Sequence, residues 1–547
     1  MWLPLPELNS GSQGLLFQFE GVDEPNPALE ASSGSTNTTR ELEVEAKFVL
    51  DQGSTFPDLS QVAPLGAVTV SALNALYFDT PDLDLQNLGV TLRRRSGGSD
   101  SGWHLKVKSE ADGERVELHA PIAGARPPGS LRSALPESVR MSPLIPVARL
   151  ETTRTETPLL SPRGTVLATL CDDEVRADTS PESASNQSGP AAVSWREVEV
   201  ELGSGDRRVL THLSRVLASS GISGAPYGSK ISRALEHWPS HVGAKQEIGA
   251  TQRAIRSYVF VQVGMIQALE EGVRLGSRDA IHRSRVAARR LRSALVTFPL
   301  LYPKALRAHL EDELRWYGGV LSDLRDVQVL MERLSQERSD RTIEEQSEAD
   351  SVLGLLEQVE ASTLEVAWQE LSSPRFELLH DLLVLLVDPR ANRTERDLAA
   401  HVEDAVLRTG VAKPIGQAYS RFLVALEAET DSDPITRALR WHAVRKASKS
   451  VRYAYEAILG EDAKASTAWQ EATSELGALQ DVVFTIESLR DLSKESVSQE
   501  KDGLGSGLAN TLLKIARQQE ERLTGQVLSA QSAFLAAISL SVDPPCE

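Results

Sequence analysis

The stretch ELEVEAKF at residues 41–48 sets the interpretation of the first half of the chain. Its charged residues, Glu41, Glu43, Glu45 and Lys47, alternate with apolar ones. Alternation with a period of two predicts a β-strand that has one apolar and one charged face. That charged face either meets water or points into a site that holds a multiply charged ligand.

Length, charge and cysteine content restrict the class of protein. The 547 residues are enough for two or three domains. A net charge of -19 argues against attraction of the whole chain to nucleic acid or to an anionic membrane, so a polyanion needs local basic clusters. Cys171 and Cys546 provide no disulfide framework and fit a reducing cytoplasm. No apolar run approaches the roughly 18 residues of a membrane helix, and the N-terminus is a poor signal peptide.

The hydrophobic period changes along the chain and divides it into two domains. Residues 1–39 are rich in Gly, Ser, Asn and Thr and are predicted to be disordered. The first domain spans residues 40–238: residues 40–203 have mostly period two and predict an antiparallel sheet or barrel, and residues 206–220 predict a helix. A linker is predicted at 239–247. Residues 248–540 have period 3.6 and predict an all-α domain. The fold class is therefore α+β multidomain. The predicted strands are ELEVEAKFVL, NALYFDT, GVTLRRRS, WHLKVKS, RVELHAPI, GTVLATLCDDEVRA and SWREVEVEL.

The helical domain contains an internal repeat. HRSRVAARRLR begins at His282 and HAVRKASKSVR begins at His442, an offset of 160 residues. LSDLRDV at 321–327 and LGALQDV at 476–482 form a second matching pair. This self-similarity predicts a tandem duplication, with halves at about 248–390 and 395–540 that each form a helical bundle.

Several predicted strands carry like charges on one face. Two strands are acidic and two or three are basic, as in TLRRR at 91–95 and REVEVEL at 196–202. One such strand would usually face water, but in a closed barrel all of these faces would point into one lumen. Buried charges must then pair with each other or with ligands. Carboxylates are suitable ligands for Mg²⁺ or Mn²⁺, and Arg and Lys bind phosphate oxygens.

The ordered set of strand motifs resembles the CYTH domain of the triphosphate tunnel metalloenzymes. Glu43, Glu45 and Lys47 match its ExExK signature, and YFDT, TLRRR, WHLKVK, RVEL, LCDDEV, REVEVEL and GSKISRAL follow in the family's order. The resemblance implies an eight-stranded antiparallel tunnel, in which Glu43, Glu45 and Lys47 are catalytic. It implies metal ligation by Glu43, Glu45, Asp172 and two of Glu197, Glu199 and Glu201, of which Glu199 and Glu201 are favoured. The doublet Asp172–Asp173 leaves open which of its two acids takes part. It implies phosphate binding by Lys47, Arg93, Arg95, Lys106, Arg154 and Lys230. Arg94 is expected to face outward by alternation.

The repeated basic segments of the helical part resemble the CHAD domain. Their spacing of 3, 4 and 3 residues places four basic side chains on one helix face in each copy. Like charges so arranged cost stability, so a ligand is expected to offset the repulsion. The resemblance implies a basic cavity that binds inorganic polyphosphate, with Asp326 and Asp481 orienting arginines. The implied binding residues are His282, Arg285, Arg289 and Arg292, and His442, Arg445, Lys449 and Arg452.

The function expected from both resemblances is metal-dependent hydrolysis of inorganic tripolyphosphate or a related triphosphate, with polyphosphate bound by the helical domain. A nucleotide or thiamine triphosphatase, an adenylate cyclase, and a polyphosphate-binding protein without catalysis remain alternatives. The cofactor is expected to be Mg²⁺ or Mn²⁺ and the location cytoplasmic, with polyphosphate granules as a possible site. No partner nucleic acid or membrane is expected, because the basic stripes lack regular aromatic residues for base stacking. Cys171 is expected to be a packed strand residue rather than a nucleophile.

Overall fold

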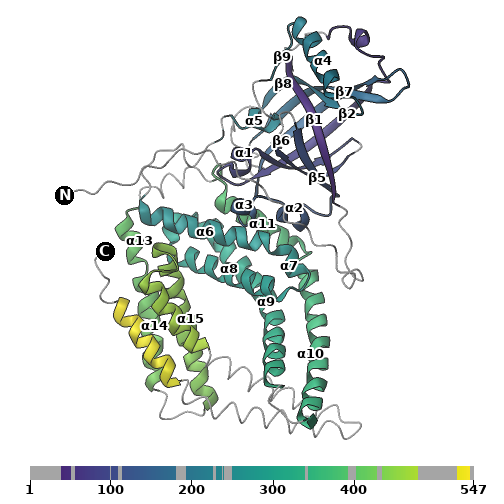
Figure 1. The fold of residues 1–547 in the computed structure, drawn as a ribbon. Coiled ribbons are helices and arrows are strands. Elements are labelled where there is room, and N and C mark those ends of the chain that lie inside the picture. Colours follow the sequence, from purple (N-terminus) through teal and green to yellow (C-terminus); the bar gives the residue numbers. More distant parts are fainter. Residues whose placement is uncertain are drawn as a thin grey trace, which may run out of the picture. The chain divides into compact units, whose positions relative to one another are not determined.

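A computed structural model gives the fold shown in Figure 1. It describes residues 38–50, 56–98, 100–108, 114–179, 192–225, 229–236, 238, 249–338, 343–391, 402–427, 434–477 and 527–541. The predicted disordered segment at 1–39 and the predicted linker at 239–247 lie almost entirely outside these ranges.

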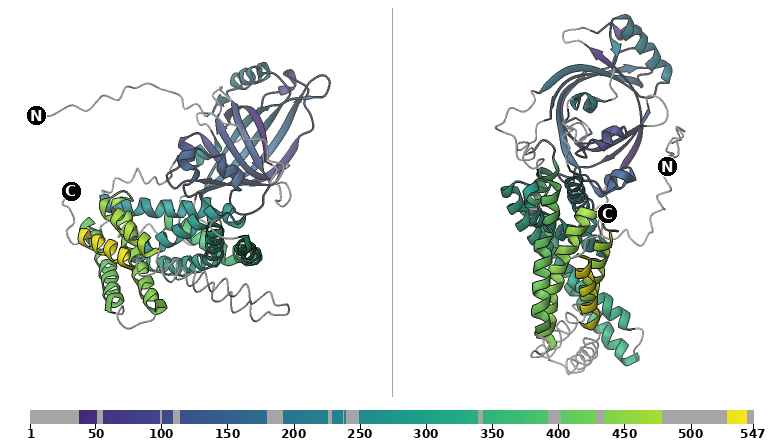
Figure 2. Two further views of the ribbon diagram at one scale, coloured as in Figure 1. Left: turned by 60° about the horizontal axis from the view of Figure 1, so that its bottom comes forward. Right: turned by 90° about the vertical axis from the view of Figure 1, so that its left-hand side faces the viewer.

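The β domain is built around a closed antiparallel barrel. Its sheet has the order β5-β4-β3-β2-β6-β7-β8-β1-β9, and an additional pairing between β5 and β1 closes it. Looking down the barrel shows a ring of strands (Figure 2). The strands are β1 (Thr39–Leu50), β2 (Thr69–Asp79), β3 (Val90–Ser96), β4 (Gly102–Lys108), β5 (Glu114–Ala120), β6 (Ile145–Leu160), β7 (Val166–Asp178), β8 (Val193–Leu202) and β9 (Ser223–Gly224).

The pairing of the strands decides which side chains face the lumen. Glu45 lies opposite Glu201 and Lys47 opposite Glu199, and residues that are directly opposite share one face of a sheet. The alternate residues Phe48, Val198 and Val200 are buried on the outer face. There they pack under helix α4 (Arg207–Ser219), which begins at the capping side chain of Asp206. The charged faces of β1 and β8 therefore line the interior.

Short helices complete the β domain. Helix α5 (Lys230–Ala234) begins after Ser229, whose hydroxyl accepts a hydrogen bond from the Ser232 amide. Its Ile231 packs in one cluster with lumen-side apolar residues such as Trp195, so α5 covers part of the lumen wall. The others are η1 (Leu59–Gln61), α1 (Asp84–Asn87), α2 (Gly129–Ser133) and α3 (Glu137–Arg140).

The second domain is helical throughout its described ranges. Helix α8 begins after the capping residue Ser277, and its buried face includes Ala287, Leu291 and Leu295. Helix α8 contacts α9, and α14 contacts α15, in each half of the predicted repeat. The helices are α6 (Ala250–Ala268), α7 (Glu270–Arg274), α8 (Arg278–Thr297), η2 (Pro299–Leu301), α9 (Lys304–Arg338), α10 (Ile343–Glu370), α11 (Pro374–Val387), α13 (Asp404–Thr409), α14 (Ala412–Glu427) and α15 (Pro434–Leu459), with further helix at 464–477 and 527–541.

The predicted fold class is confirmed: an eight-stranded antiparallel barrel precedes a helical domain. The helix expected at residues 206–220 is α4. Strand β6 is a 16-residue strand of which the sequence indicated only the segment LETTRTE at 150–156, around Arg154. Within the described residues, no helix is both long enough and apolar enough to cross a membrane.

Candidate functional site

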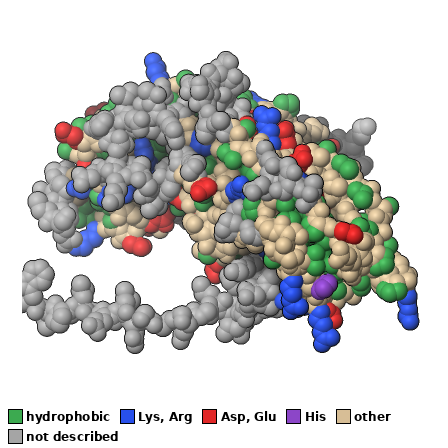
Figure 3. Space-filling model, turned by 90° about the horizontal axis from the view of Figure 1, so that it is seen from above, with side chains coloured by type: hydrophobic (Ala, Val, Ile, Leu, Met, Phe, Trp, Pro, Cys, Tyr) green, Lys and Arg blue, Asp and Glu red, His purple; other side chains and the backbone are tan. Residues whose placement is uncertain are grey.

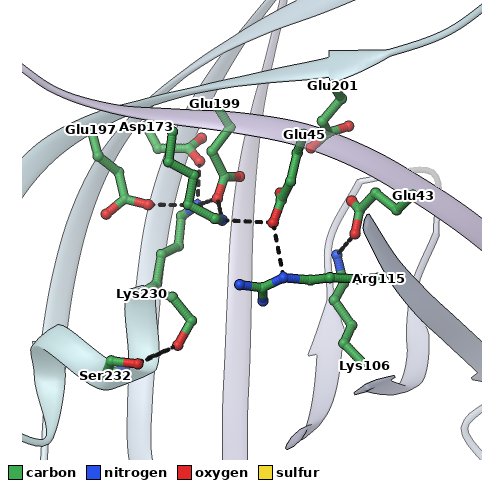
Figure 4. A network of polar contacts seen from close by, with 12 residues as sticks. Glu43, Glu45, Lys106, Arg115, Asp173, Glu197, Glu199, Glu201, Lys230 and Ser232 are labelled. Carbon is green, nitrogen blue, oxygen red and sulfur yellow. Dashed lines mark hydrogen bonds and ion pairs between the residues drawn. The ribbon is translucent and has the colours of Figure 1, made fainter. Parts of the chain in front are cut away.

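The centre of the tunnel is a network of buried acids and bases (Figure 4). The carboxylate of Glu199 forms ion pairs with three cations, which are Lys47, Arg154 at 2.7 Å and Lys230 at 2.7 Å. Burial raises the pKa of Glu199, but the charges of Lys230, Lys47 and Arg154 outweigh burial and hold it well below the usual range. This carboxylate therefore stays ionised and holds the three cations together.

Arg154 connects three carboxylates of β7 and β8. Its guanidinium donates to both oxygens of Asp173 at 2.9 and 2.8 Å, to Glu199 at 2.7 Å and to Glu201 at 3.1 Å. Bidentate pairing of this kind fixes the plane of the guanidinium. Arg154 is thus paired with the acidic set, and its predicted binding of phosphate stays a prediction.

The structure places Asp173, and not Asp172, inside the tunnel. Asp173 is fully buried and lies 3.0 Å from the ammonium of Lys230. Asp172 instead pairs with Arg196 at 2.7 Å, and Arg196 lies over the ring of Phe56 on the outer side of the sheet. Adjacent residues of a strand point to opposite faces, so only one member of the doublet can face the lumen. The choice of Asp172 as a tunnel residue was therefore wrong.

A second group of charges lies beside the first on β1, β4 and β5. Lys106 contacts Glu43 at 2.5 Å, and Glu45 lies 3.3 Å from Arg115 and 3.2 Å from Lys47. In Figure 4, Glu43, Glu45 and Glu201 lie on one side of the network, away from Lys230. Glu201 is the most open of the three, with 32% of its side chain exposed.

The basic strand β3 supplies the opposite wall. Arg93 donates to the hydroxyl of Tyr77 at 3.4 Å and lies 3.8 Å from Glu117, while Arg95 contacts Asp100. Burial, together with the charges of Arg93 and Arg154, lowers the pKa of Arg95 to about 10. Like charges that crowd together in this way favour an anionic ligand. The side chain of Arg94 lies over the Trp103 ring, on the face of the sheet opposite to Arg93 and Arg95, so it points outward as expected.

Of the polar members of the tunnel, sequence reasoning missed His104. Arg115, Glu117 and Glu197 lie on the charged strand faces that alternation predicts, although no role was assigned to Arg115 and Glu117. Glu197 accepts from the Trp195 indole at 2.6 Å and lies 2.9 Å from Lys230. Alternation with Lys106 along WHLKVK would have placed His104 on a charged face as well. Their partners follow only from strand pairing, which the sequence does not state.

Cys171 faces the lumen but has no sign of reactivity. It is fully buried and lies opposite Glu199 in the β7–β8 ladder. Burial raises the pKa of its thiol, and the nearby Glu201 adds to the effect. A protonated thiol is a poor nucleophile, which agrees with the expected packing role.

The carboxylates fit a hard divalent metal by their chemistry. Glu43, Glu45 and Glu201 offer oxygen donors of the kind that Mg²⁺ and Mn²⁺ prefer. Among the described residues, no three His, Cys, Asp or Glu side chains already converge on one point. The acids point toward Lys and Arg instead, so metal ligation by these residues stays a prediction.

The basic stripe on α8 contacts α9 of its own half of the helical domain and α15 of the second half. Arg289 donates to the Tyr453 hydroxyl of α15 at 3.0 Å. Arg285 donates to Ser322 at 2.7 Å and lies 3.6 Å from Asp326, in line with the orienting role expected for that acid. Burial and the charges of Arg289, Arg325 and Arg445 lower the pKa of Arg285. The two predicted stripes therefore share one region, and Arg325 is an additional member.

A buried acid on α15 links both halves. Glu456 accepts from Arg452 at 2.6 Å and from the Tyr258 hydroxyl at 3.1 Å, and it lies 3.1 Å from Arg290. Burial, followed by the charges of Arg325, Arg289 and Arg285, lowers the pKa of His282. His442, Arg445 and Lys449 lie on α15 as the spacing predicts, and Arg292 lies on α8. Asp481 lies outside the described residues.

The described surface has no comparable concentration of charge on the face shown in Figure 3. There, blue and red side chains are scattered among hydrophobic and other residues.

Comparisons with known proteins agree with this architecture. The CYTH domain matches residues 41–235, and the CHAD domain matches residues 258–490. An uncharacterised Mycobacterium tuberculosis protein, Rv2226, is 32% identical over 454 residues, which cover 79% of this chain and 83% of that protein.

Two solved structures resemble about half of this chain. PptA from Streptomyces chartreusis is 20% identical with a TM-score of 0.40, and covers 52% of this chain and 99% of its own. The CHAD domain from the plant Ricinus communis is 23% identical with a TM-score of 0.40, and covers 53% of this chain and 92% of its own. On the two domain matches, the chain belongs to the family of proteins in which a CYTH domain is followed by a CHAD domain.

Proposed function

We propose that the barrel hydrolyses a linear triphosphate, with inorganic tripolyphosphate as the substrate, and that the helical domain binds inorganic polyphosphate. One observation supports the first part above all others. Carboxylates of β1 and β8 and cations of β3, β4, β6 and α5 meet inside one closed barrel. Such an interior matches a compact ligand that carries both divalent metal and several phosphate groups.

The residues divide the chemical work by type. Glu43, Glu45 and Glu201 would hold Mg²⁺ or Mn²⁺, which when bound neutralises phosphate charge and activates water. Arg93, Arg95 and Lys106 would orient phosphate oxygens and stabilise the charge that develops on the transferred phosphoryl group. Lys47, Arg154 and Lys230 hold the acids in place and add positive potential at the phosphate.

No covalent enzyme intermediate is needed for this reaction. Water attacks a terminal phosphorus, the bridging P–O bond breaks, and the products are phosphate and diphosphate. The buried, protonated Cys171 takes no part. The described part of the tunnel shows no base-recognition motif, which favours an inorganic triphosphate over a nucleotide.

The test is phosphate release from tripolyphosphate, ATP and thiamine triphosphate with Mg²⁺ or Mn²⁺. Wild type should release phosphate fastest from tripolyphosphate, and Glu45→Gln should lose at least about 100-fold in rate, a loss typical for a group that stabilises charge in the transition state. Glu174→Gln, on the exposed outer face of β7, is the matched control. Absence of release from all three substrates would refute hydrolysis, and preference for ATP would favour a nucleotide triphosphatase.

The polyphosphate part rests on the shared region of the two basic stripes. The charge of Arg445 on α15 acts on Arg285 of α8, and Arg289 of α8 donates a hydrogen bond to the Tyr453 hydroxyl of α15. A flexible polyanion without bases suits such a surface, because it needs phosphate contacts and no stacking partners.

A further inference from the structure

Two histidines lie in the tunnel wall and have no role in the proposed hydrolysis. His104 on β4 lies opposite Arg93 on β3 and opposite His119 on β5. The two imidazole rings lie 4.8 Å apart, centre to centre, at an interplanar angle of 61°. Both rings therefore belong to the same row of the barrel as a phosphate-binding arginine.

The hydrogen bonds of His104 fit a protonated ring. Its Nδ1 lies 2.8 Å from Glu117 Oε1, and its Nε2 lies 3.0 Å from the carbonyl oxygen of Asp100. Both partners are acceptors, whereas a neutral imidazole has a single N–H to donate. Burial raises the pKa of Glu117, but the hydrogen bond with His104 and the charges of Lys106 and Arg93 outweigh it, so that carboxylate stays ionised. Only an imidazolium satisfies both contacts of His104.

The surrounding charges oppose protonation of His104. Burial and the charges of Arg93 and Arg95 lower the pKa of His104 to about 4, and the hydrogen bond that His104 donates to Glu117 opposes this effect. The charged and titratable groups that face this region are Arg93 and Arg95 on β3, Lys106 on β4, Glu117 and His119 on β5, Glu43 on β1, Tyr77 on β2, Arg154 on β6 and Asp100 in the β3–β4 loop. Without a ligand in the tunnel, His104 is therefore neutral, and its single N–H can donate to only one of its two acceptor partners.

We propose that a linear triphosphate entering beside Arg93 and Arg95 brings a proton onto His104, so that binding is coupled to proton uptake. The inference rests on the proposed function, because it requires a phosphate group in that part of the tunnel. The phosphate charge offsets the two arginines, and the proton then completes both hydrogen bonds of His104. His104 acts through Glu117 and Arg93 and is a positioning residue.

His119 adds a second polar group to this wall. Gly102 has no side chain, and a Cβ at that position would lie 2.1 Å from His119 Nε2. The imidazole thus occupies space that a glycine leaves open. Within the described residues its buried Nε2 has no hydrogen-bond partner, and a phosphate oxygen could supply one.

The proton uptake can be measured by titration calorimetry. A non-hydrolysable triphosphate with methylene bridges is titrated into the full chain with Mg²⁺ at pH 6.0, in two buffers of different ionisation enthalpy. Wild type should take up about one proton more than His104→Gln, and its affinity should change about tenfold more per pH unit. His212→Gln, an exposed histidine on α4, should match wild type. If His104→Gln does not fold, Glu117→Gln takes its place and should likewise reduce the uptake.

The outcomes separate this inference from the proposed function. Equal proton uptake in wild type and His104→Gln, with tripolyphosphate still hydrolysed, overturns the inference and leaves hydrolysis standing. Excess uptake without hydrolysis supports the inference and refutes the enzyme. Absence of analogue binding overturns both.

Discussion

The aspartate doublet of β7 offers a sharp test of the tunnel network. Asp173 is fully buried and bridges Arg154 and Lys230, whereas Asp172 forms a partly exposed pair with Arg196 on the outer side. Asparagine has nearly the shape of aspartate, but its amide group would direct N–H donors at cations that are donors themselves. Asp173→Asn should therefore be far more costly than Asp172→Asn.

The magnitudes follow from burial. Removing one partner of a buried ion pair costs about 3–5 kcal/mol, and the lower end applies because Glu199 still contacts both cations. A partly exposed pair such as Asp172–Arg196 contributes roughly 0–1 kcal/mol. At about 1.4 kcal/mol per factor of ten, amides of β7 and β8 should exchange about 100-fold faster in Asp173→Asn and at most about fivefold faster in Asp172→Asn.

Hydrogen–deuterium exchange with peptide-level mass spectrometry is the suitable assay, because a chain of two domains does not unfold in one step. Peptides from the helical domain serve as an internal reference and should be unchanged. Equal protection in both variants, or a larger loss in Asp172→Asn, would refute the assignment of Asp173 to the network.

Three other perturbations test separate parts of the structure. Gly102→Ala should destabilise the β domain by about 1–3 kcal/mol, because the added Cβ meets His119 and the Ala120 carbonyl, whereas Gly124→Ala, with open space around it, should leave the thermal midpoint unchanged. The pKa of His104 is about 4 in the folded chain and about 6.5 in the unfolded chain, so its contribution to stability is complete above pH 6.5 and is lost as the pH falls toward 4. Between pH 6.5 and 4.5, calorimetry should show a smaller drop in the melting midpoint of the β domain for His104→Gln than for wild type. An equal drop in both would contradict a neutral His104 ring in the folded chain. The double variant Arg289→Glu with Lys449→Glu should abolish the gel shift with long-chain polyphosphate but leave tripolyphosphate hydrolysis unchanged. The control Arg283→Glu, which lies on α8 outside the stripe, should retain the shift. An unchanged shift in the double variant would contradict polyphosphate binding by the stripes.

Much of the barrel could be predicted because its strands alternate strictly. In ELEVEAKF at 41–48 and EVEVEL at 197–202 every second residue is charged, so each strand and its charged face are visible without a partner. Strand β6 was not visible in the same way. It contains Pro146 and Pro158 near its ends and a run of threonines, and its face is set by its pairing with β2 and β7.

The limits of prediction for the site have the same origin. Periodicity gives the face of a residue only where a strand's phase is known, and Asp172–Asp173 offers two acids in opposite phases. The ladder with Arg154 and Glu197 fixes that phase, and pairing between distant strands is a tertiary property. In the helical domain, spacing predicted the stripe from His282 to Arg292. It could not reveal that Glu456, a turn beyond the second stripe, holds Arg452 and contacts Arg290.

The ion pairs inside the tunnel have a thermodynamic consequence for how its ligands arrive. A divalent metal alone would take Glu43 and Glu45 from Lys106, Lys47 and Arg115, and would leave each of these buried cations with one carboxylate fewer. A triphosphate alone would do the reverse and take cations from the acids. Each ligand supplies the charge that the other displaces, so the two should bind with positive cooperativity, each tightening the affinity for the other by the same factor.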